Sequence, residues 1–244
     1  MLDCILRKHW SVKRTLLCGF LAAATTWPIS ASAVDVQDCF NVELFRGDPY
    51  RAVAACRLLA DQGDVRGQHM LGLAYEGGVG GPQDFVEAAK WFRKAADQGD
   101  ASSQCRLGFM YREGQGVPKD FAEALKWYRK AADQGDDWAQ ANLGSMYFAG
   151  DGVPEDHAKA LEWYRKAADQ GNYWGQRILG LGYLNGVGVP QDYVLAHMWL
   201  TLAVASGSEE AKKQRDQAAK KMTREQIAEA QRLAQEWEPK NGTK

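Results

Sequence analysis

Four tryptophans, Trp91, Trp127, Trp163 and Trp199, stand 36 residues apart in this chain of 244 residues. Their surroundings repeat as well: AAKWFRKAADQG at 88–99 returns as ALKWYRKAADQG at 124–135, and again around Trp163. A period of roughly 20 to 50 residues is typical of a solenoid, in which each unit cannot bury its apolar face alone and stacks on its neighbours. The interval therefore predicts stacked repeats, which present binding surfaces more often than active sites.

The first half of each unit predicts a helix. In 100–135 it carries Leu107, Gly108 and Tyr111, whose i, i+1, i+4 spacing places them on one helical face. A helical glycine costs about 1 kcal/mol relative to alanine, so its recurrence indicates that a neighbouring backbone or large ring packs against it. The predicted core of the repeats is Trp91, Trp127, Trp163, Trp199, Gly72, Gly108, Gly144, Gly180, Tyr75, Tyr111, Tyr147 and Tyr183.

A glycine-rich turn ends this first helix, as in Gly-Gln-Gly-Val-Pro at 114–118. It follows a helix and lacks a third glycine, so it is not a phosphate-binding loop. An aspartate stands two residues after each proline, and at Asp84 and Asp120 a glutamate follows three residues later (Glu87 and Glu123), which predicts a capping box for the second helix. The second helix then shows an apolar stripe at i, i+3, i+4, i+7 and i+8.

These motifs together resemble the Sel-1-like repeat, a relative of the tetratricopeptide repeat with a longer, glycine-containing loop. Four units match the pattern, at 64–99, 100–135, 136–171 and 172–207. The resemblance implies an all-α fold, a right-handed α-solenoid of antiparallel helix pairs. The fourth unit departs from the pattern at Leu195, Leu200 and Thr201, so we expect it to be covered differently.

The N-terminus has the anatomy of a cleavable signal peptide. Basic residues precede an apolar run at 16–24, and Ala31-Ser32-Ala33 follows, so we expect cleavage before Val34. A membrane anchor is the alternative, but spanning needs about 20 apolar residues. Cys18 suggests lipidation, but the bulky Leu16 and Leu17 precede it and the apolar run continues past it. We therefore predict a periplasmic or secreted protein without a transmembrane segment in its mature form.

Removing residues 1–33 leaves 26 basic and 30 acidic side chains, a formal charge of −4. This charge makes nucleic acid an unsuitable partner. The chain also has no H-E-x-x-H, C-x-x-C or G-x-S-x-G motif. We expect no metal, no cofactor and no catalytic residues. A weak hydrolase of β-lactam or peptidoglycan-related substrates stays as an alternative, because some cysteine-rich relatives have been so labelled, although S-x-x-K is lacking here.

Residues 34–63 predict an N-terminal helical hairpin, with helices at 38–46 and 49–62. Cys39 and Cys56 would lie level across the turn, and disulfides persist outside the cytosol. We therefore predict a Cys39–Cys56 bridge, with two buried thiols as the alternative. Cys105 is left over, as a thiol or in an unusual pairing.

Residues 208–244 leave the repeat and predict a C-terminal pair of capping helices. Thr223-Arg224-Glu225-Gln226 has the form of a capping box. The helix that it opens would place Ile227, Ala230, Ala234 and Trp237 on one face. Such a pair would cover the apolar end of the last repeat.

The resemblance to tetratricopeptide arrays implies that the other face of the first helices lines a groove for a protein or peptide partner. The residues in these columns that we predict to bind are Arg66, His69, Phe109, Arg112, Trp138, Ser145, Phe148, Trp174, Arg177, Leu181 and Leu184. Tryptophan and arginine dominate interface hot spots, which favours an apolar and acidic peptide. Alternatively, Trp138 and Trp174 merely cover the junction between units. The predicted function is an exported protein-interaction scaffold; a structural envelope-assembly factor is a further alternative.

Overall fold

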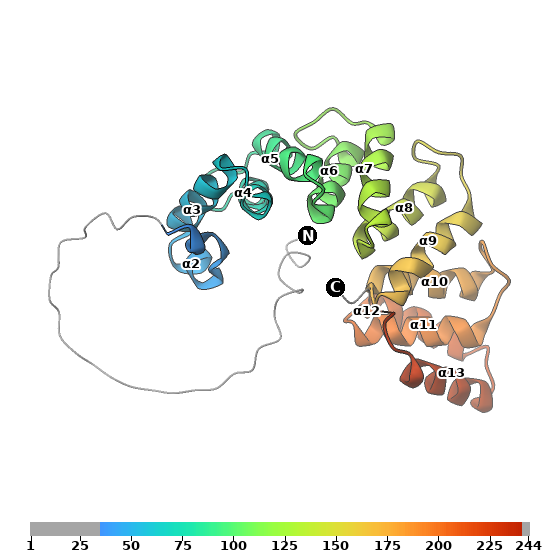
Figure 1. The fold of residues 1–244 in the computed structure, drawn as a ribbon. Helices are drawn as coiled ribbons and strands as arrows, with labels where there is room; N and C mark the ends of the chain where they lie inside the picture. Colours follow the sequence, from blue (N-terminus) through green and yellow to red (C-terminus); the bar gives the residue numbers. More distant parts are fainter. Residues whose placement is uncertain (1–34, 241–244) are drawn as a thin grey trace, which may run out of the picture. The chain divides into compact units, whose positions relative to one another are not determined.

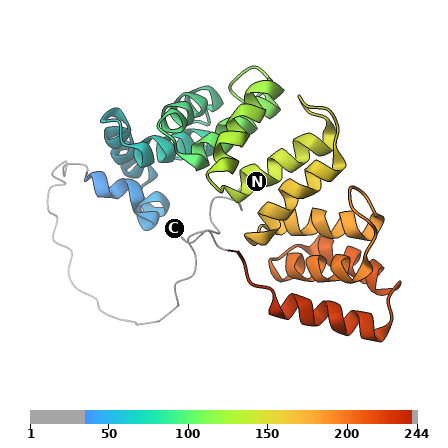
Figure 2. The same cartoon turned by 45° about the vertical axis from the view of Figure 1, so that its right-hand side comes forward.

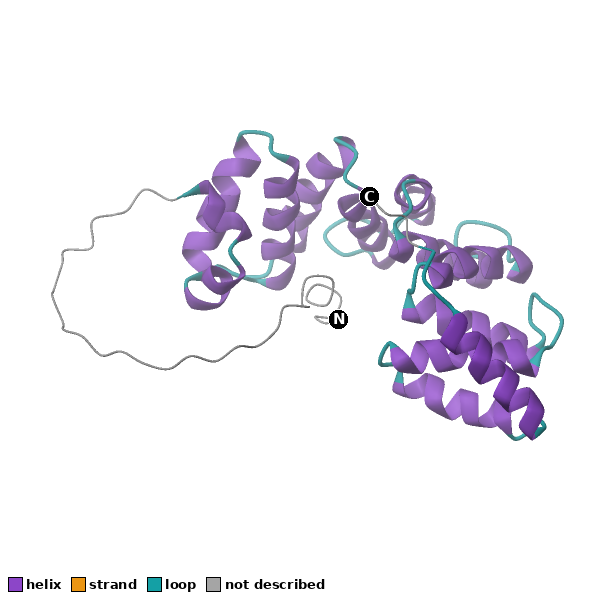
Figure 3. Ribbon diagram, turned by 60° about the horizontal axis from the view of Figure 1, so that its bottom comes forward, coloured by secondary structure: helices purple, strands orange, loops and turns teal. Residues whose placement is uncertain are grey.

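The computed structural model describes residues 35–240, so the predicted signal peptide lies outside the described residues. The described part is helical throughout and contains no strand (Figures 1 and 3). The N-terminal elements are η1 (Val36–Phe40), α2 (Val42–Gly47) and α3 (Pro49–Asp61). The four repeats are α4 (Val65–Gly77) with α5 (Phe85–Asp97), α6 (Ala101–Glu113) with α7 (Phe121–Asp133), α8 (Asp137–Ala149) with α9 (His157–Asp169), and α10 (Tyr173–Asn185) with α11 (Tyr193–Ala205). The last pair is α12 (Glu209–Ala219) and α13 (Arg224–Glu236).

From α3 to α12 each helix packs against the next in sequence, and α13 packs against α11 (Figures 1 and 2). This order makes the described residues an α-solenoid of helix pairs, as the sequence predicts. No helix in 35–240 is both long and apolar enough to cross a bilayer.

The recurrent glycine of each first helix faces a ring or a leucine of its partner helix. A Cβ built on Gly108 would lie 2.8 Å from Tyr128 Cδ1, and one on Gly72 would lie 2.7 Å from Phe92 Cδ1. In the fourth repeat Leu200 takes the place of the ring opposite Gly180. The predicted close approach is therefore confirmed, and it sets the distance between the two helices of each repeat.

The aspartates before the second helices are N-caps, but the predicted capping boxes at Glu87 and Glu123 are wrong. Asp84 accepts hydrogen bonds from the backbone N–H groups of Val86 and Glu87. The backbone N–H of Asp84 already donates to the carbonyl of Tyr75, so it has no need of the Glu87 carboxylate. Glu87 and Glu123 pair instead with Lys90 and Lys126.

The tryptophans of the repeat differ in burial. Trp127 is only 2% exposed and shares a packed cluster with Ala96 of the preceding repeat and Leu107 of its own. Trp163 is half-buried, with Lys166 over its ring, and packs against the clusters on both sides of it, around Leu143 and around Leu161. Trp199 packs edge-on against Trp237 of the last helix pair.

Glutamines form a hydrogen-bond ladder that joins the two helices of each repeat, and its first-helix members also donate to a backbone carbonyl of the helix before. Gln98, Gln134 and Gln170 each donate from Nε2 to the Oε1 of a buried glutamine in the first helix of the same repeat, at 2.8 to 2.9 Å. The acceptors are Gln68, Gln104 and Gln140. In the fourth repeat Ser206 stands in the donor position, and the buried Gln176 Oε1 has no hydrogen-bond partner. The ladder ends there because the serine side chain is too short to extend it.

Substitutions in this ladder should change stability in opposite directions. We expect Gln134→Ser to lower the free energy of unfolding by about 1–3 kcal/mol, because it leaves Gln104 Oε1 buried and unpaired. Ser206→Gln should raise that free energy, because it supplies a donor to Gln176. Urea titration measures both, and a Ser206→Gln variant no more stable than the parent would contradict the ladder.

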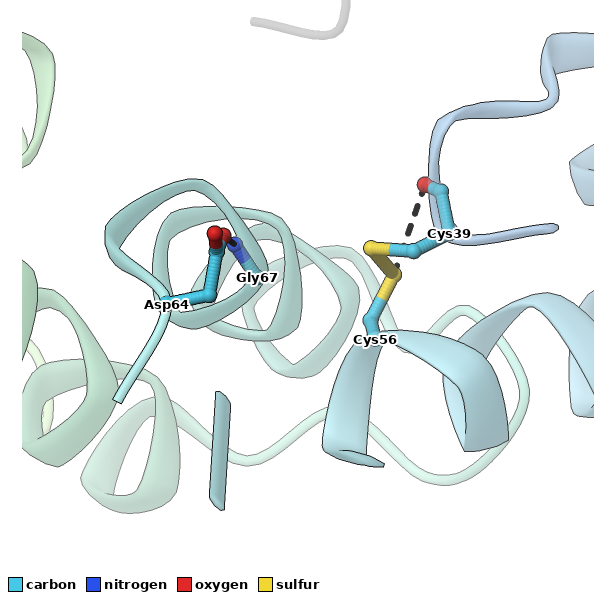
Figure 4. The surroundings of a disulfide bond; sticks show 4 residues. All are labelled: Cys39, Cys56, Asp64 and Gly67. Atoms are coloured by element: carbon cyan, nitrogen blue, oxygen red, sulfur yellow. Dashed lines mark hydrogen bonds between the residues drawn. A yellow bond between two sulfur atoms is a disulfide. The ribbon is translucent and has the colours of Figure 1, made fainter. Parts of the chain in front are cut away.

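The N-terminal hairpin differs from its prediction in one element. Instead of one helix over 38–46, η1 and α2 are separated at Asn41, whose side chain accepts from the N–H groups of Glu43 and Leu44 and so starts a new helix. Cys39 is therefore in the 3₁₀ turn. The structure joins it to Cys56 of α3 as a disulfide, with the Cα atoms 4.6 Å apart and both residues fully buried (Figure 4).

Thiol counting under denaturing conditions tests this bridge in a chain that begins at residue 34. We expect one reactive thiol per such chain, from Cys105, because its other two cysteines are bonded to each other. A chain-entropy model puts such a bridge at about 3 kcal/mol. Three reactive thiols would show that the pair stays reduced.

The predicted C-terminal cap is confirmed in its main features. Thr223 and Gln226 form a capping box at the start of α13, each side chain bonding the other's backbone N–H. Ala230 is buried, and Leu233, Ala234 and Trp237 pack against the core of the last two repeats. The end of the solenoid is thus covered by a degenerate helix pair.

Candidate protein-binding surface

The predicted groove residues lie on the first helices of the repeats, α4, α6, α8 and α10. They differ in how exposed their side chains are. Arg66 and Phe148 are exposed, whereas Leu184 is 8% exposed and belongs to the core around Trp199. Leu184 follows Tyr183 on the turn of α10 that faces that core, and its exposed part lines a hollow beside Tyr193. The half-buried members are His69, Phe109, Arg112, Trp138, Ser145, Trp174, Arg177 and Leu181.

Polar members of this face tie repeats together at the N-terminal junctions. His69 Nδ1 of the first repeat lies 2.8 Å from Ser103 Oγ and 3.4 Å from Asp100 Oδ1 of the second. Burial raises the pKa of Asp100, but hydrogen bonds from His69 and Ser103 outweigh it and hold that pKa below its ordinary value. These side chains form hydrogen bonds with one another, so fewer of their polar atoms are available to a partner.

At the junction of repeats 2 and 3, three positions form a closed polar set. Arg112 at the end of α6 donates to Ser145 Oγ of α8 at 3.1 Å. Its guanidinium also lies 3.5 Å from the carboxylate of Asp151, in the following loop. The set brings together one residue from the first helix of a repeat, one from the next first helix, and one from the loop after it.

At the junction of repeats 3 and 4, the same three positions hold Phe148, Leu181 and Val187, each 36 residues further on. They border a hollow of about 180 Å³, which we call the apolar hollow. Its lining residues are Phe148, Leu161, Tyr164, Ile178, Leu181, Gly182, Asn185 and Val187. An apolar set therefore replaces the ion pair and hydrogen bond of the preceding junction.

The apolar hollow is open and uncharged. Phe148 is 43% exposed at its rim, where its ring stacks on His157 at 4.5 Å between centroids. Gly182 stands where the two preceding repeats bury Met110 and Met146, so the wall lacks a side chain at that position. Burial raises the pKa of Tyr164 to about 12, against a smaller opposing effect of its hydrogen bond with Ser145, so this wall residue stays neutral at physiological pH. The hollow can hold an apolar side chain of moderate size.

Trp138 and Trp174 contact different residues and do not form one aromatic patch. The ring of Trp174 meets Tyr164 edge-on at 5.7 Å and packs against the core of repeats 3 and 4. The ring of Trp138 meets Tyr173 edge-on, also at 5.7 Å. Arg177, predicted to flank them, lies 3.5 Å from the Glu210 carboxylate of α12. Trp174 thus contributes to packing between repeats, as the alternative interpretation anticipates.

Single alanine substitutions should separate these two rings. We expect Trp174→Ala to lower the free energy of unfolding by about 1–3 kcal/mol, below the ~3–5 kcal/mol typical of a fully buried tryptophan. Trp138→Ala should cost less than about 1 kcal/mol, because what it removes is mainly one aromatic pair. Equal losses in chemical denaturation would mean that both rings belong to the core.

Sequence reasoning found Phe148 and Leu181 but missed Leu161, Ile178, Gly182 and Val187. The signal was present in the repeat columns, where Gly182 interrupts a series of methionines and Val187 replaces Asp151. What the sequence alone did not show is that the loop of one repeat meets the first helix of the preceding repeat. Within 35–240, no three His, Cys, Asp or Glu side chains gather as a metal ion would require.

Stacked helix pairs with a one-sided binding face define the class of helical-repeat scaffold proteins. Comparison identifies the family: residues 65–100, 101–136, 139–172 and 175–208 each match the Sel1 repeat. This chain belongs to the Sel1 repeat family.

Two solved structures are similar over most of the chain. One is a Sel1 repeat protein from Oxalobacter formigenes, 31% identical, with a TM-score of 0.72, covering 86% of this chain and 88% of that one. The other is c5321, a protective antigen of uropathogenic Escherichia coli with an SLR fold, 35% identical, with a TM-score of 0.72 over 83% of this chain. This chain spans only 45% of c5321. No curated protein sequence matches.

Proposed function

We propose that this protein is an exported interaction scaffold that binds a protein or peptide partner through the apolar hollow between repeats 3 and 4. The observation that carries the proposal is the replacement of Arg112, Ser145 and Asp151 by Phe148, Leu181 and Val187 at the next junction. An exposed aromatic ring beside an uncharged hollow is suited to an anchoring apolar side chain. Export rests on the signal-peptide pattern of residues 1–33.

The Sel1 repeat fold supports an interaction role, since stacked repeats offer an extended surface. The partner would be a component of the cell envelope or its surroundings, which keeps an envelope-assembly role as a special case of the same proposal. The hydrolase alternative has weaker support, because the walls of the apolar hollow carry only the Asn185 amide and the Tyr164 phenol as polar side chains. Neither is an activated nucleophile or a base at neutral pH.

A transplant of the closed junction tests the proposal. The variant Phe148→Arg with Leu181→Ser and Val187→Asp copies the polar set of repeats 2 and 3 into the next junction. Because the same set closes that earlier junction, we expect the fold and melting temperature to be kept. Partner capture from envelope extract should fall at least about tenfold, equivalent to ~1.4 kcal/mol.

Tyr50→Arg is the matched control, because it changes an exposed ring (72% exposed) far along the chain from the hollow. Quantitative mass spectrometry should find the same captured proteins with this control as with the parent. A transplant variant that captures them equally well would contradict the proposal. Turnover of a chromogenic β-lactam by the parent, lost in the transplant variant, would establish the hydrolase instead.

A further inference from the structure

A second hollow lies beside the apolar one because the last helix pair lacks the loop of the other repeats. In those repeats the second glycine of the loop packs on the start of the preceding second helix. A Cβ on Gly116 would lie 2.0 Å from the Phe85 carbonyl oxygen, and one on Gly188 would lie 2.5 Å from that of His157. Each such loop therefore covers the N-terminal turn of the second helix before it.

The connection in the last pair is too short to provide this cover. Seven residues join α10 to α11, whereas four join α12 to α13. Tyr193, which begins α11, occupies the position that Phe85 and His157 occupy in their helices. Instead of lying under a loop, it lines a hollow of about 360 Å³, which we call the lysine hollow.

The lysine hollow is positively charged, with Leu184 and Tyr193 as its apolar wall. Lys220 and Lys221 line it together with the amides of Asn185, Gln191 and Gln217. Its lining contains no carboxylate. Within residues 35–240, neither lysine belongs to an ion pair, whereas several other charged groups near this end do, such as Arg177 with Glu210. Two adjacent ammonium groups without a counter-charge favour an anionic ligand group.

The two hollows border each other, because Asn185 lines both. One is apolar and of side-chain size, and the other is cationic with amide groups that can bind a peptide backbone. Both arise from departures from the repeat: the apolar replacements at the junction of repeats 3 and 4, and the shortened loop of the last pair. A ligand that spans Asn185 would use both.

We propose that the partner presents an extended peptide segment with an apolar side chain in the apolar hollow and, within a few residues, an acidic side chain in the lysine hollow. This rests on the proposed function and specifies the chemistry that the scaffold recognises. An extended chain advances about 3.3 Å per residue, so neighbouring hollows are reached by side chains close in sequence. The amides of Asn185 and Gln217 would then face the peptide backbone between the two anchors.

A positional library of N-acetylated, C-terminally amidated octapeptides tests the inference. The blocked ends ensure that any acidic preference comes from side chains. Incubated with the purified protein, the library should yield bound peptides enriched in Leu or Phe at one position and in Asp or Glu within four residues of it. For a selected peptide, fluorescence anisotropy should show affinity reduced at least tenfold when its acidic residue is replaced by the matching amide.

Charge-reversal variants identify the hollow responsible. Lys220→Glu with Lys221→Glu should remove the acidic preference while keeping the apolar one. Lys212→Glu with Lys213→Glu is the matched control, because these exposed lysines lie on α12, the helix that leads into the connection with Lys220 and Lys221, carry the same charge change and do not line the hollow. The control should select peptides as the parent does.

The outcomes separate this inference from the proposed function. Apolar enrichment without acidic enrichment, or equal loss in both lysine variants, would overturn the acidic anchor and leave the scaffold proposal standing. If the parent selects no peptide at all, the peptide-binding function fails together with the inference. If basic residues replace acidic ones among the peptides bound by the Lys220→Glu, Lys221→Glu variant, the assignment of the anchor to this hollow is established.

Discussion

The structure depends on how closely the two helices of each repeat approach one another. Gly72, Gly108, Gly144 and Gly180 each leave room for a ring or a leucine that no Cβ would permit. This contact fixes the spacing within a repeat, and the 36-residue period carries the spacing along the chain. Equivalent positions therefore meet equivalent neighbours at every junction. When one repeat has a different residue type at such a position, the surface at that junction differs in chemistry from the others.

Some features of the junctions recur in every repeat, and others vary from one repeat to the next. The glutamine ladder and the loop glycines repeat almost unchanged: the first-helix glutamines bond a carbonyl of the preceding helix, and the loop glycines pack on the start of the preceding second helix. The exposed columns vary, from an ion pair at Arg112 to a solvent-exposed ring at Phe148. The glutamine ladder ends in the fourth repeat, where Ser206 stands in place of a glutamine. The loop glycines end at the last helix pair, which has a four-residue connection in place of the loop. The two hollows proposed to bind the partner lie where the repeat is least regular.

Much of the fold could be predicted from the sequence, because helix periodicity, the aspartate caps and the glycine turns are local signals. The break at Asn41 was missed because a capping side chain competes with an otherwise continuous helical pattern. The capping boxes at Glu87 and Glu123 were wrongly predicted, because the backbone N–H groups of the cap residues Asp84 and Asp120 donate instead to carbonyls of the preceding helix. The apolar hollow could not be predicted, because three segments from two repeats must meet to form it.

The central claim is that the junction of repeats 3 and 4, and not the closed junction before it, receives the partner. Site-specific photo-crosslinking in the producing cell tests this most directly, with a photoreactive phenylalanine analogue placed at position 148 or at position 112. These positions are equivalent, one repeat apart, and differ in whether the junction is open. The account predicts a discrete crosslinked product from position 148 and none from position 112. Crosslinking from position 112 alone, or from both positions equally, would contradict it.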